Sequence, residues 1–534
     1  MKAYNTPPAN DNRDSAFDGS ALHSLLDAAT RDIAAAPTLT AMVLILLPLL
    51  RNLGLSILQA VIQHRDGQFD HGKTAPPCSI CRRPLARTRN RRPITRYTLL
   101  GRLHYRRRAW QCVCCKCSEY PVDTSLDLKP RLGGHSDEFA SMVTLLTTLL
   151  PNAKAMTLFE KCFGFAVSTQ LSGGLARDIG DQLVTAEIQR SEMLWQMRTT
   201  APEKIEPVPA ELRKLKRIKR VYVMVDDSKI GIQEGKRGRN APNRSPASDP
   251  LSRALREEKA KAAKAAKAGK PGTSKPAQVT KTEDDSGFRN ARAILIFSES
   301  DLAGISKGRH QLLRRHIVAH VGTLEEWRKL VHMAMVDAGV FTAEEVVFIA
   351  DGGAGIWEMF DELISPTRER RVVQLLDFYH AMTHLWAAGR AIHGGDTPEQ
   401  KKKCRKWVTG LQTDLREGRV SNVIHRLGKL KLKGKAAEEV AKAKRYFDTH
   451  RKRMRYKWAR DNGMLIGSGA MESVHAWMIQ PRCRLPGMRW SVAGANAMLR
   501  LRCSWACGTW DEKFAQAARV PIPVASKIEV KLAA

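Results

Sequence analysis

Two short apolar runs that each end in carboxylates constrain the fold of this sequence more than any other feature. VYVMVDD (221–227) and VVFIAD (346–351) are β-branched and apolar until their last residues. Continuous apolar runs of this length are typical of strands that are buried on both faces of a sheet. Two further strand patterns are ARAILIFSE (291–299) and RVVQLLDFYH (371–380), and helical segments separate the first of them from 346–351. The sequence therefore predicts an α/β core in which helices flank a mixed sheet.

Three acidic residues stand where such a sheet would gather them. Asp226 and Asp351 end the two apolar runs, and Glu472 lies in GSGAMESV (467–474), where an expected helix starts. Carboxylates that converge from separate elements are the ligands that Mg²⁺ and Mn²⁺ prefer. Two such ions, about 4 Å apart, activate an attacking water or 3′-hydroxyl and stabilise the leaving oxygen of a phosphodiester. The alternative for any single strand-terminal Asp is a turn or a helix cap.

Clustered cysteines predict a second, structural metal site. The spacing Cys-x-x-Cys occurs at 78–81, and CVCCKC follows at 112–117. Paired thiolates at this spacing suit tetrahedral Zn²⁺, and four of the six would bind one ion. A disulfide framework is the alternative, which a reducing compartment disfavours. The two-residue gap occurs both in Cys112 with Cys115 and in the rival pair Cys114 with Cys117, and the favoured ligands are Cys78, Cys81, Cys112 and Cys115.

The charge balance indicates a polyanionic partner. Lys and Arg number 88 against 54 Asp and Glu, which gives a formal net charge of +34. Nucleic acid is the usual partner for such an excess, and ribosome association or a merely solubilising basic surface is the alternative. Arginines also crowd the cysteine-rich segment, which would present positive charge to a phosphate backbone. These are Arg82, Arg83, Arg87, Arg89, Arg91, Arg92, Arg106, Arg107 and Arg108.

The N-terminal composition predicts a cytoplasmic protein without a membrane partner. MKAYNTPPANDNRD carries acids and prolines before any apolar stretch, unlike a secretory signal. The apolar run Ala41–Leu50 has about half the length of a bilayer span, and Arg51 follows it directly. The scattered cysteines are then assigned to packing; they are Cys162, Cys404, Cys483, Cys503 and Cys507.

Shifts in composition divide the chain into four regions. In the C-terminal region, a basic insertion has no apolar stripe and is expected to be disordered. A helical, very basic stretch precedes Glu472 in the same region. The regions are a helical N-terminal region (1–70), a zinc-ribbon-like DNA-binding module (71–130), a helical connector for which DNA contact is one interpretation (131–218), and a catalytic core (219–534) with the basic insertion at 235–287.

Beyond single motifs, an ordered set of phrases resembles those of Kra-type insertion-sequence transposases. The resemblance covers about residues 78–125 and 220–510. It implies a DDE transposase with an RNase H-like core, related to Mutator-like transposases, and a helical insertion at 385–460 before the last catalytic helix. The phrases are VYVMVD, IADGGAGIWEMF, LLDFYHAMTHLW, IGSGAMESVHAWMIQPRCRLPGMRWS and MLRLRC.

The resemblance assigns the catalytic, metal-binding acids to Asp226, Asp351 and Glu472. The sequence departs from the family at the first of them, because Asp227 stands where a glycine is usual. Successive strand residues face opposite sides, so only one of the two aspartates can point into the site from a regular strand. The motif match favours Asp226.

An Asp-x-x-His phrase, as in Mutator-like elements, follows the second acid at 377–380. The resemblance makes His380 a candidate for orienting a water or a phosphate oxygen near the metals. The alternative is a core histidine beside Trp386. His384 is expected to be structural.

Further cations and aromatic residues near Glu472 are candidates for holding DNA. Guanidinium groups near a metal-bound phosphodiester would position the backbone, although a solvated basic face is the alternative. KRYFDTHRKRMRYKWAR (444–460) mixes cations with aromatic rings that could stack on bases, or it forms a solvated helix with buried aromatics. The candidates are Arg482, Arg484, Arg489, Trp490, Arg451, Arg453 and Arg455.

The resemblance implies a transposase that cleaves insertion-sequence ends with two metal ions and transfers the 3′-hydroxyl into target DNA. Expected cofactors are two Mg²⁺ or Mn²⁺ ions and one structural Zn²⁺. Expected partners are double-stranded DNA, both element ends and target, and further copies of the chain in a homodimer or larger oligomer. The expected location is the nucleoid. Two alternatives stay open: a catalytically silent, domesticated DNA-binding protein, and an RNase H-type nuclease without strand transfer.

Overall fold

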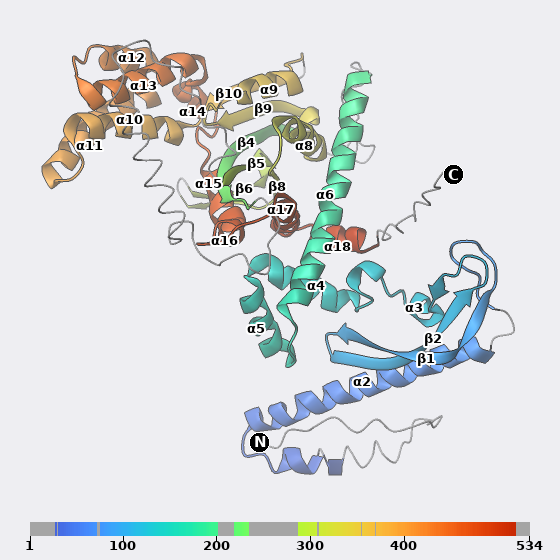
Figure 1. The fold of residues 1–534 in the computed structure, drawn as a ribbon. Helices are drawn as coiled ribbons and strands as arrows, with labels where there is room; N and C mark the ends of the chain where they lie inside the picture. Colours follow the sequence, from blue (N-terminus) through green and yellow to red (C-terminus); the bar gives the residue numbers. More distant parts are fainter. Residues whose placement is uncertain are drawn as a thin grey trace, which may run out of the picture. The chain divides into compact units, whose positions relative to one another are not determined.

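A computed structural model describes most of the chain and divides it into two compact units (Figure 1). One unit is Met1–Met193 together with Ala497–Ala534, and the other is Leu194–Asn496. The sequence-based division had kept the residues after Ala497 with the core. The described residues are 27–28, 30–71, 75–200, 218–233, 287–306, 309–353, 355–368 and 370–519, with the side chains of 199–200 excepted. Apart from Gly287, the predicted basic insertion 235–287 lies outside them.

The first unit begins with a long helix and a small antiparallel sheet. Alternate residues of the second strand, such as Leu103 and Tyr105, are buried against Ile62 of the helix. Asp66 and Asp70, near the end of the helix, bind arginines of the sheet. The two long strands pair along most of their length as an antiparallel hairpin within the segment expected to be zinc-ribbon-like. The elements are α2 (Leu39–His71), β1 (Leu85–Thr98), β2 (Gly101–Cys112) and β3 (Ser118–Glu119), in the order β1-β2-β3.

Helices make up the rest of the first unit, including the described part of the connector expected to be helical at 131–218. Ser136 caps α4 through its side chain, and Pro151 separates α4 from α5. Phe139 and Phe159 pack with Trp510 from the C-terminal end of the chain, so that end completes this core. The helices are α3 (Pro121–Ser125), η1 (Pro130–Leu132), α4 (Asp137–Leu149), α5 (Asn152–Phe163), α18 (Trp510–Arg519), and the larger parts of α6 (Thr169–Thr200) and α17 (Val492–Ala506), whose remaining residues belong to the second unit.

α2 is long and apolar enough to cross a membrane, as judged by length and composition over Leu39–Asp70. One such helix is weak evidence of a membrane span, because core helices of soluble proteins pass the same test. The absence of a membrane partner stays a prediction.

The second unit is built on a mixed five-stranded sheet with the order β10-β9-β4-β5-β8. β4 and β10 both run parallel to β9, whereas β5 is antiparallel to both of its neighbours, β4 and β8. The predicted α/β class with a mixed sheet is confirmed. The strands are β4 (Ile218–Gly231), β5 (Phe288–Ser298), β8 (His316–His320), β9 (Ala343–Ala350) and β10 (Arg371–Leu376).

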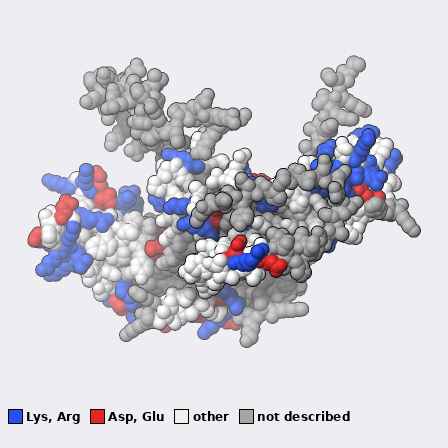
Figure 2. Space-filling model, turned by 90° about the horizontal axis from the view of Figure 1, so that it is seen from below, with Lys and Arg blue, Asp and Glu red and all other residues white. Residues whose placement is uncertain are grey.

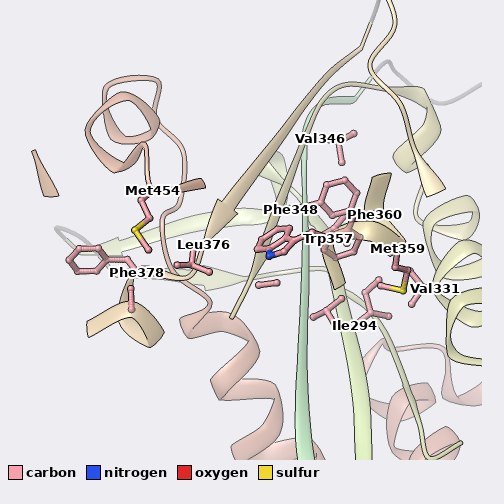
Figure 3. Packing of buried hydrophobic residues seen from close by; sticks show 14 of the residues in the cluster. Ile294, Val331, Val346, Phe348, Trp357, Met359, Phe360, Leu376, Phe378 and Met454 are labelled. Carbon is pink, nitrogen blue, oxygen red and sulfur yellow. The ribbon is translucent and has the colours of Figure 1, made fainter. Parts of the chain in front are cut away.

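Helices α8 (Leu324–Asp337) and α9 (Ile356–Leu363) cover one face of this sheet. A capping box between Thr323 and Glu326 starts α8. The rings of Phe348 on β9 and Phe360 on α9 stack with their centroids 4.0 Å apart, and Trp357 packs beside them (Figure 3). Because alternate residues of β4 point into this apolar layer, the others, including Asp226, face the opposite side.

The segment between 299 and 343 contains β structure that the sequence analysis missed. It had predicted only helices there, and α8 with the short η6 (Val340–Thr342) accounts for part of that prediction. β8 is five residues long, too short to establish a period, and its pairing with β5 fixes it as a strand. The other elements are η5 (Glu299–Asp301), β6 (Leu302–Ser306) and β7 (Arg309–Leu312), and β6 and β7 form a hairpin.

A helical region lies between β10 and the helix that carries Glu472, as predicted for 385–460. It starts earlier, because Asp377 caps a helix directly after β10. Leu411, Val423 and Phe447 belong to the same apolar cluster as the sheet. The helices are α10 (Phe378–His393), α11 (Pro398–Arg416), α12 (Val420–Gly428), α13 (Gly434–His450), η7 (Arg451–Arg453), α14 (Tyr456–Asp461), α15 (Gly469–Val474), the π-helical η8 (His475–Ile479) and α16 (Gln480–Cys483).

Candidate functional site

Two of the predicted acids lie next to each other at one edge of the five-stranded sheet. Val225 of β4 is in register with Ala350 of β9, so Asp226 and Asp351 follow at adjacent positions of two parallel strands. Neighbouring strands are about 4.8 Å apart, which brings the two carboxylates into electrostatic contact. The sheet thus joins residues that are far apart in the sequence.

The pKa of Asp226 is raised to about 6. Burial is the main cause, and the charges of Asp351 and Asp227 add to it, while the amide of Asp227 and the charge of His380 act in the opposite direction. A carboxylate that is held among other carboxylates gains stability when a cation binds beside it. The electrostatics of this edge therefore favour a cation.

The two adjacent aspartates have different surroundings. Asp226 is half-buried, and its Oδ2 lies 3.4 Å from Nε2 of His475. Asp227 is exposed, and its Oδ2 accepts a hydrogen bond of 3.1 Å from Nδ2 of Asn290 on β5. Asp226 therefore contacts His475, three residues after Glu472, whereas Asp227 contacts β5; the choice of Asp226 as the ligand stays a prediction.

Glu472 is exposed on α15, a short helix that packs against β4 and β5. His475 follows it by three residues, a spacing that puts both on the same side of a helix. Burial lowers the pKa of His475 to about 4, so its ring is neutral at pH 7. A π-helical turn starts at His475, and such turns occur frequently at functional sites. The sequence analysis missed His475, although it lies in the matched phrase.

A buried carboxylate, Asp377, ties the loop before Glu472 to the sheet. Its side chain accepts hydrogen bonds from the backbone amide and the hydroxyl of Ser468. Its backbone amide donates to the carbonyl of Ala350, at 2.8 Å, directly before Asp351. A side chain on Gly467 would collide with the ring of Tyr379, so glycine is needed there. The sequence-based prediction gave Asp377 no role beyond its place in the Asp-x-x-His phrase at 377–380.

Aromatic side chains from α10 and α13 surround Asp351. The hydroxyl of Tyr446 donates a 2.7 Å hydrogen bond to the backbone carbonyl of Asp351. Gly352 has a φ of 86°, and a Cβ there would come within 2.9 Å of the ring of His450. His384 stacks on Tyr446 with ring centroids 3.8 Å apart, and its pKa is lowered to about 4, first by burial. His384 is thus packed, as predicted.

His380 lies on the first turn of α10 and is half-buried. Its ring neighbours are His384 and Tyr446, at centroid distances of 5.5 and 6.2 Å. The charge of His380 lowers the pKa of Asp226. The position differs from the predicted alternative, which had set His380 beside Trp386.

The three predicted acids do not form a tight cluster in the structure. In the described part of the chain, every group of three or more metal-binding side chains whose ligand atoms all lie within 4.8 Å of one another contains cysteines. The carboxylates of Asp226, Asp351 and Glu472 are therefore not gathered that tightly. Asp226 and Asp351, at adjacent strand positions, offer hard oxygen donors of the kind that Mg²⁺ and Mn²⁺ prefer.

Of the four residues after Glu472 that are predicted to hold DNA, two are packed into the fold and two are exposed. Arg482 is buried, and its guanidinium lies 5.6 Å from the ring centre of Trp490, so it is packed and does not offer a solvated cation. The backbone of Trp490 pairs with the end of β4. Arg484 and Arg489 are exposed, and Arg489 also donates to the carbonyl of Gly287.

The aromatic residues of 444–460 are mostly packed. Phe447 and Tyr456 are fully buried, and Trp458 is covered by the guanidinium groups of Arg371 and Arg455, each 4.7 Å from its ring centre. The structure agrees with a solvated helix with buried aromatics, the alternative to base stacking. The cations differ: Arg451 and Arg455 are exposed, whereas Arg453 is half-buried over Trp357.

Lys and Arg side chains gather in separate groups on the face drawn in Figure 2. One group lies at the end where Figure 1 has α11 to α13, and another lies at the end that carries the β1–β2 hairpin. Asp and Glu are fewer on this face. Each unit therefore carries its own basic surface.

The cysteines of the first unit form a group that could hold a metal ion: Cys78, Cys81, Cys112 and Cys115. Two backbone turns with the same geometry present them. Arg82, after the second cysteine of one turn, and Lys116, after that of the other, both have a positive φ, of 62° and 57°. Their amides donate to the carbonyls of Cys78 and Cys112, at 3.0 and 3.1 Å.

The first cysteine of each turn has the same hydrogen-bonding environment. The backbone amide of Cys81 bonds the sulfur of Cys78, and that of Cys115 bonds the sulfur of Cys112. In each case this hydrogen bond is the largest influence on the thiol, and the pKa of Cys112 is lowered to about 6. Thiolates are the form that binds zinc. This repeated geometry favours the pair Cys112 and Cys115 over the rival pair.

The rival pair is separated in the structure. Cys114 is exposed, whereas Cys117 lies 3.4 Å from Cys78 and 3.2 Å from Cys115, sulfur to sulfur. All eleven cysteines are free, so the disulfide alternative is wrong. Packing is confirmed for Cys404, Cys483 and Cys503, which are buried, but Cys162 is exposed because its side of α5 faces solvent.

No protein-family model and no curated protein matches this chain.

Proposed function

We propose that the second unit is an RNase H-like catalytic core and that the protein is a DNA transposase of the Kra type. The observation that carries the proposal is the sheet order β10-β9-β4-β5-β8, with Asp226 and Asp351 adjacent at its edge. An RNase H-like sheet has three antiparallel strands followed by two that are parallel to the first, in the spatial order 5-4-1-2-3. The order and strand directions here agree with that arrangement.

The connection of Glu472 to this sheet supports the same proposal. α15 packs against β4, and Asp377 joins the preceding loop to the ends of β9 and β10. The helical insertion enters between β10 and α15, where the resemblance implies one. Three acids from a strand, a strand end and a helix would thus reach one reaction centre.

Asp226, Asp351 and Glu472 would hold two divalent cations. Such ions supply activation of the attacking hydroxyl and stabilisation of the leaving oxygen of the phosphodiester. The chain's own residues fix the carboxylates: neutral His475 lies against Asp226, and Tyr446 holds the backbone of Asp351. Such supporting contacts keep ligands in place before the ions arrive. His380 lies close enough to influence Asp226 and would orient a water or a phosphate oxygen.

The first unit would bind the element ends. The four-cysteine group would hold one structural Zn²⁺, and the β1–β2 hairpin beside it is rich in arginine. The exposed Arg484, Arg489, Arg451 and Arg455 would contact phosphates near the acids. With a net charge of +34, binding to DNA would be strong and salt-dependent.

The test is a cleavage and joining assay with labelled duplexes that carry the DNA flanking the coding sequence. We expect Mg²⁺-dependent nicks at the element boundary and joining of the new 3′-ends to a target plasmid. Asp226→Asn, Asp351→Asn and Glu472→Gln should each reduce cleavage by about a thousandfold or more while the duplex is still bound. Asp227→Asn is the matched control and should keep most of the activity.

The outcomes separate the alternatives. Binding without cleavage by the wild-type chain would indicate a silent DNA-binding protein, and cleavage without joining would indicate a nuclease. Loss of activity in Asp227→Asn with full activity in Asp226→Asn would overturn the choice of the first ligand.

A further inference from the structure

The N-terminal part of α2 exposes a broad apolar surface. Large apolar side chains are solvent-exposed along it, from Leu39, 76% exposed, to Leu50, 53% exposed. Soluble monomers rarely expose contiguous apolar patches beyond a few hundred Å², and larger patches mark interaction sites. The exposed side chains are Leu39, Val43, Leu44, Leu46, Leu47, Leu50, Ile57 and Val61.

Five of these side chains follow the spacing of a coiled-coil seam. Leu39, Val43, Leu46, Leu50 and Ile57 are separated by four, three, four and seven residues. Alternating steps of three and four place side chains on one stripe, which a second helix can cover with its own. The half-exposed Leu53 falls on the stripe where the seven-residue gap occurs. We call these six residues the α2 seam.

A different face of the same helix is already occupied. Leu58, Ile62 and Phe69 pack against β2 and α3, and Asp66 and Asp70 bind arginines of the hairpin. The seam is therefore a second apolar face on a helix that the fold has already anchored. In the described part of the first unit, five of the six seam side chains stay between 39% and 76% exposed, so the seam is at most partly covered.

The geometry does not suit a lipid bilayer. Anchoring starts at Arg51, whose guanidinium donates to the carbonyl of Gly164, and continues to Asp70. The free part, Leu39–Leu50, is about 18 Å long at the rise of an α-helix. A bilayer core is about 30 Å thick. Helices that lie in a membrane surface carry Lys and Arg on their polar face, whereas this part has no charged residue.

We propose that the α2 seam pairs with the α2 seam of a second copy of this chain. A stripe of this kind is self-complementary, as a twofold interface requires. If the five exposed side chains of the seam become covered, the apolar area removed from water is roughly 500–1,000 Å² over both copies. Specific interfaces bury about 1,200–2,000 Å², so the seam supplies much of a small interface, and association is expected at micromolar concentration.

The proposal does not depend on the proposed function, because it is tested by the molar mass of the protein in solution and not by its activity. Sedimentation equilibrium of the full chain, freed of DNA and kept in about 1 M salt to suppress charge effects, should give twice 59.6 kDa. The double variant Leu46→Glu with Leu50→Glu should sediment as a monomer. The control is Asn52→Glu with Gln59→Glu, at two exposed polar positions of the same helix, and it should remain a dimer.

Zinc content and circular dichroism of each variant report whether the first unit is still folded. A monomeric wild-type chain would overturn the proposal, and so would a seam variant that stays dimeric. A wild-type chain that is monomeric and sediments with neutral phosphatidylcholine vesicles would assign the surface to lipid and also overturn it.

Discussion

The two candidate metal sites are assembled in opposite ways. The zinc ligands come in two local pairs, each within one backbone turn, and a single hairpin brings the turns together. The acids come from positions as distant as Asp226 and Glu472, and no two of them share a turn. The zinc group therefore depends on short-range geometry, whereas the acid site depends on the register of a whole sheet. Each site should be breakable without the other.

The largest expected effect is the loss of zinc. Cys78→Ser or Cys112→Ser removes a ligand from a site whose binding free energy is of the order of 10 kcal/mol in small zinc modules. We expect the metal content to fall from one zinc per chain to none, with the β1–β2 hairpin losing protection from amide hydrogen exchange. Cleavage of non-specific DNA by the second unit should persist.

Cys114→Ser is the matched control, because this cysteine is exposed and lies outside the four-cysteine group. It should keep the zinc. Retention of zinc in Cys112→Ser, with its loss in Cys114→Ser, would reverse the assignment of the second pair.

The next effect is on the acid site alone. Asp377→Ala removes a buried carboxylate that accepts hydrogen bonds from Ser468 and Tyr379. We expect a destabilisation of the second unit by about 2–4 kcal/mol, since each bond to a charged group contributes and their donors become unsatisfied. Urea unfolding followed by the fluorescence of Trp357 and its neighbours measures it. An unchanged urea midpoint would contradict the proposal that Asp377 holds the loop before Glu472 against the sheet. The zinc content of the first unit should not change.

A smaller effect is expected at Asp351. Tyr446→Phe removes the hydroxyl that donates to the Asp351 carbonyl and keeps the ring that stacks on His384. The cost should be about 1 kcal/mol, the usual value of one hydrogen bond. The Mg²⁺ concentration for half-maximal cleavage should rise, because the Asp351 backbone is held less firmly. Equal Mg²⁺ dependence in both proteins would show that this bond does not position the carboxylate.

The smallest effect is a gain in stability from Asp226→Asn. The folded pKa of about 6 is raised from the ordinary 3.8, so the ionised form weakens the fold progressively as pH rises through that window. Above pH 6 the metal-free variant should be more stable than wild type by about 1 kcal/mol or less, since solvent screens this partly exposed group. Thermal unfolding at pH 8 and pH 4 measures it. The gain should vanish at pH 4, and a gain that is equal at both would exclude an electrostatic cause.

Much of the fold could be predicted from local patterns. The apolar runs around Val223 and Phe348 identified buried strands, and Cys-x-x-Cys identified both zinc turns. The hairpin β6–β7 and β8 were missed, because five residues carry no reliable period and β8 is a strand through its pairing with β5. Arg482 was a candidate for phosphate contact because it follows Glu472, yet it is buried against Trp490.

The sequence by itself determined which residues could bind metal and in what local geometry. Thiol spacing within one turn is a property of the backbone nearby, so the pair Cys78 and Cys81 is readable without a fold, whereas the choice between the two rival second pairs needed the structure. Only the tertiary structure decided that Asp226 lies against His475, that Asp227 contacts Asn290, and that Asp377 joins three segments. The physical reason is that a side chain's neighbours across a sheet depend on strand order and register, which no local pattern encodes.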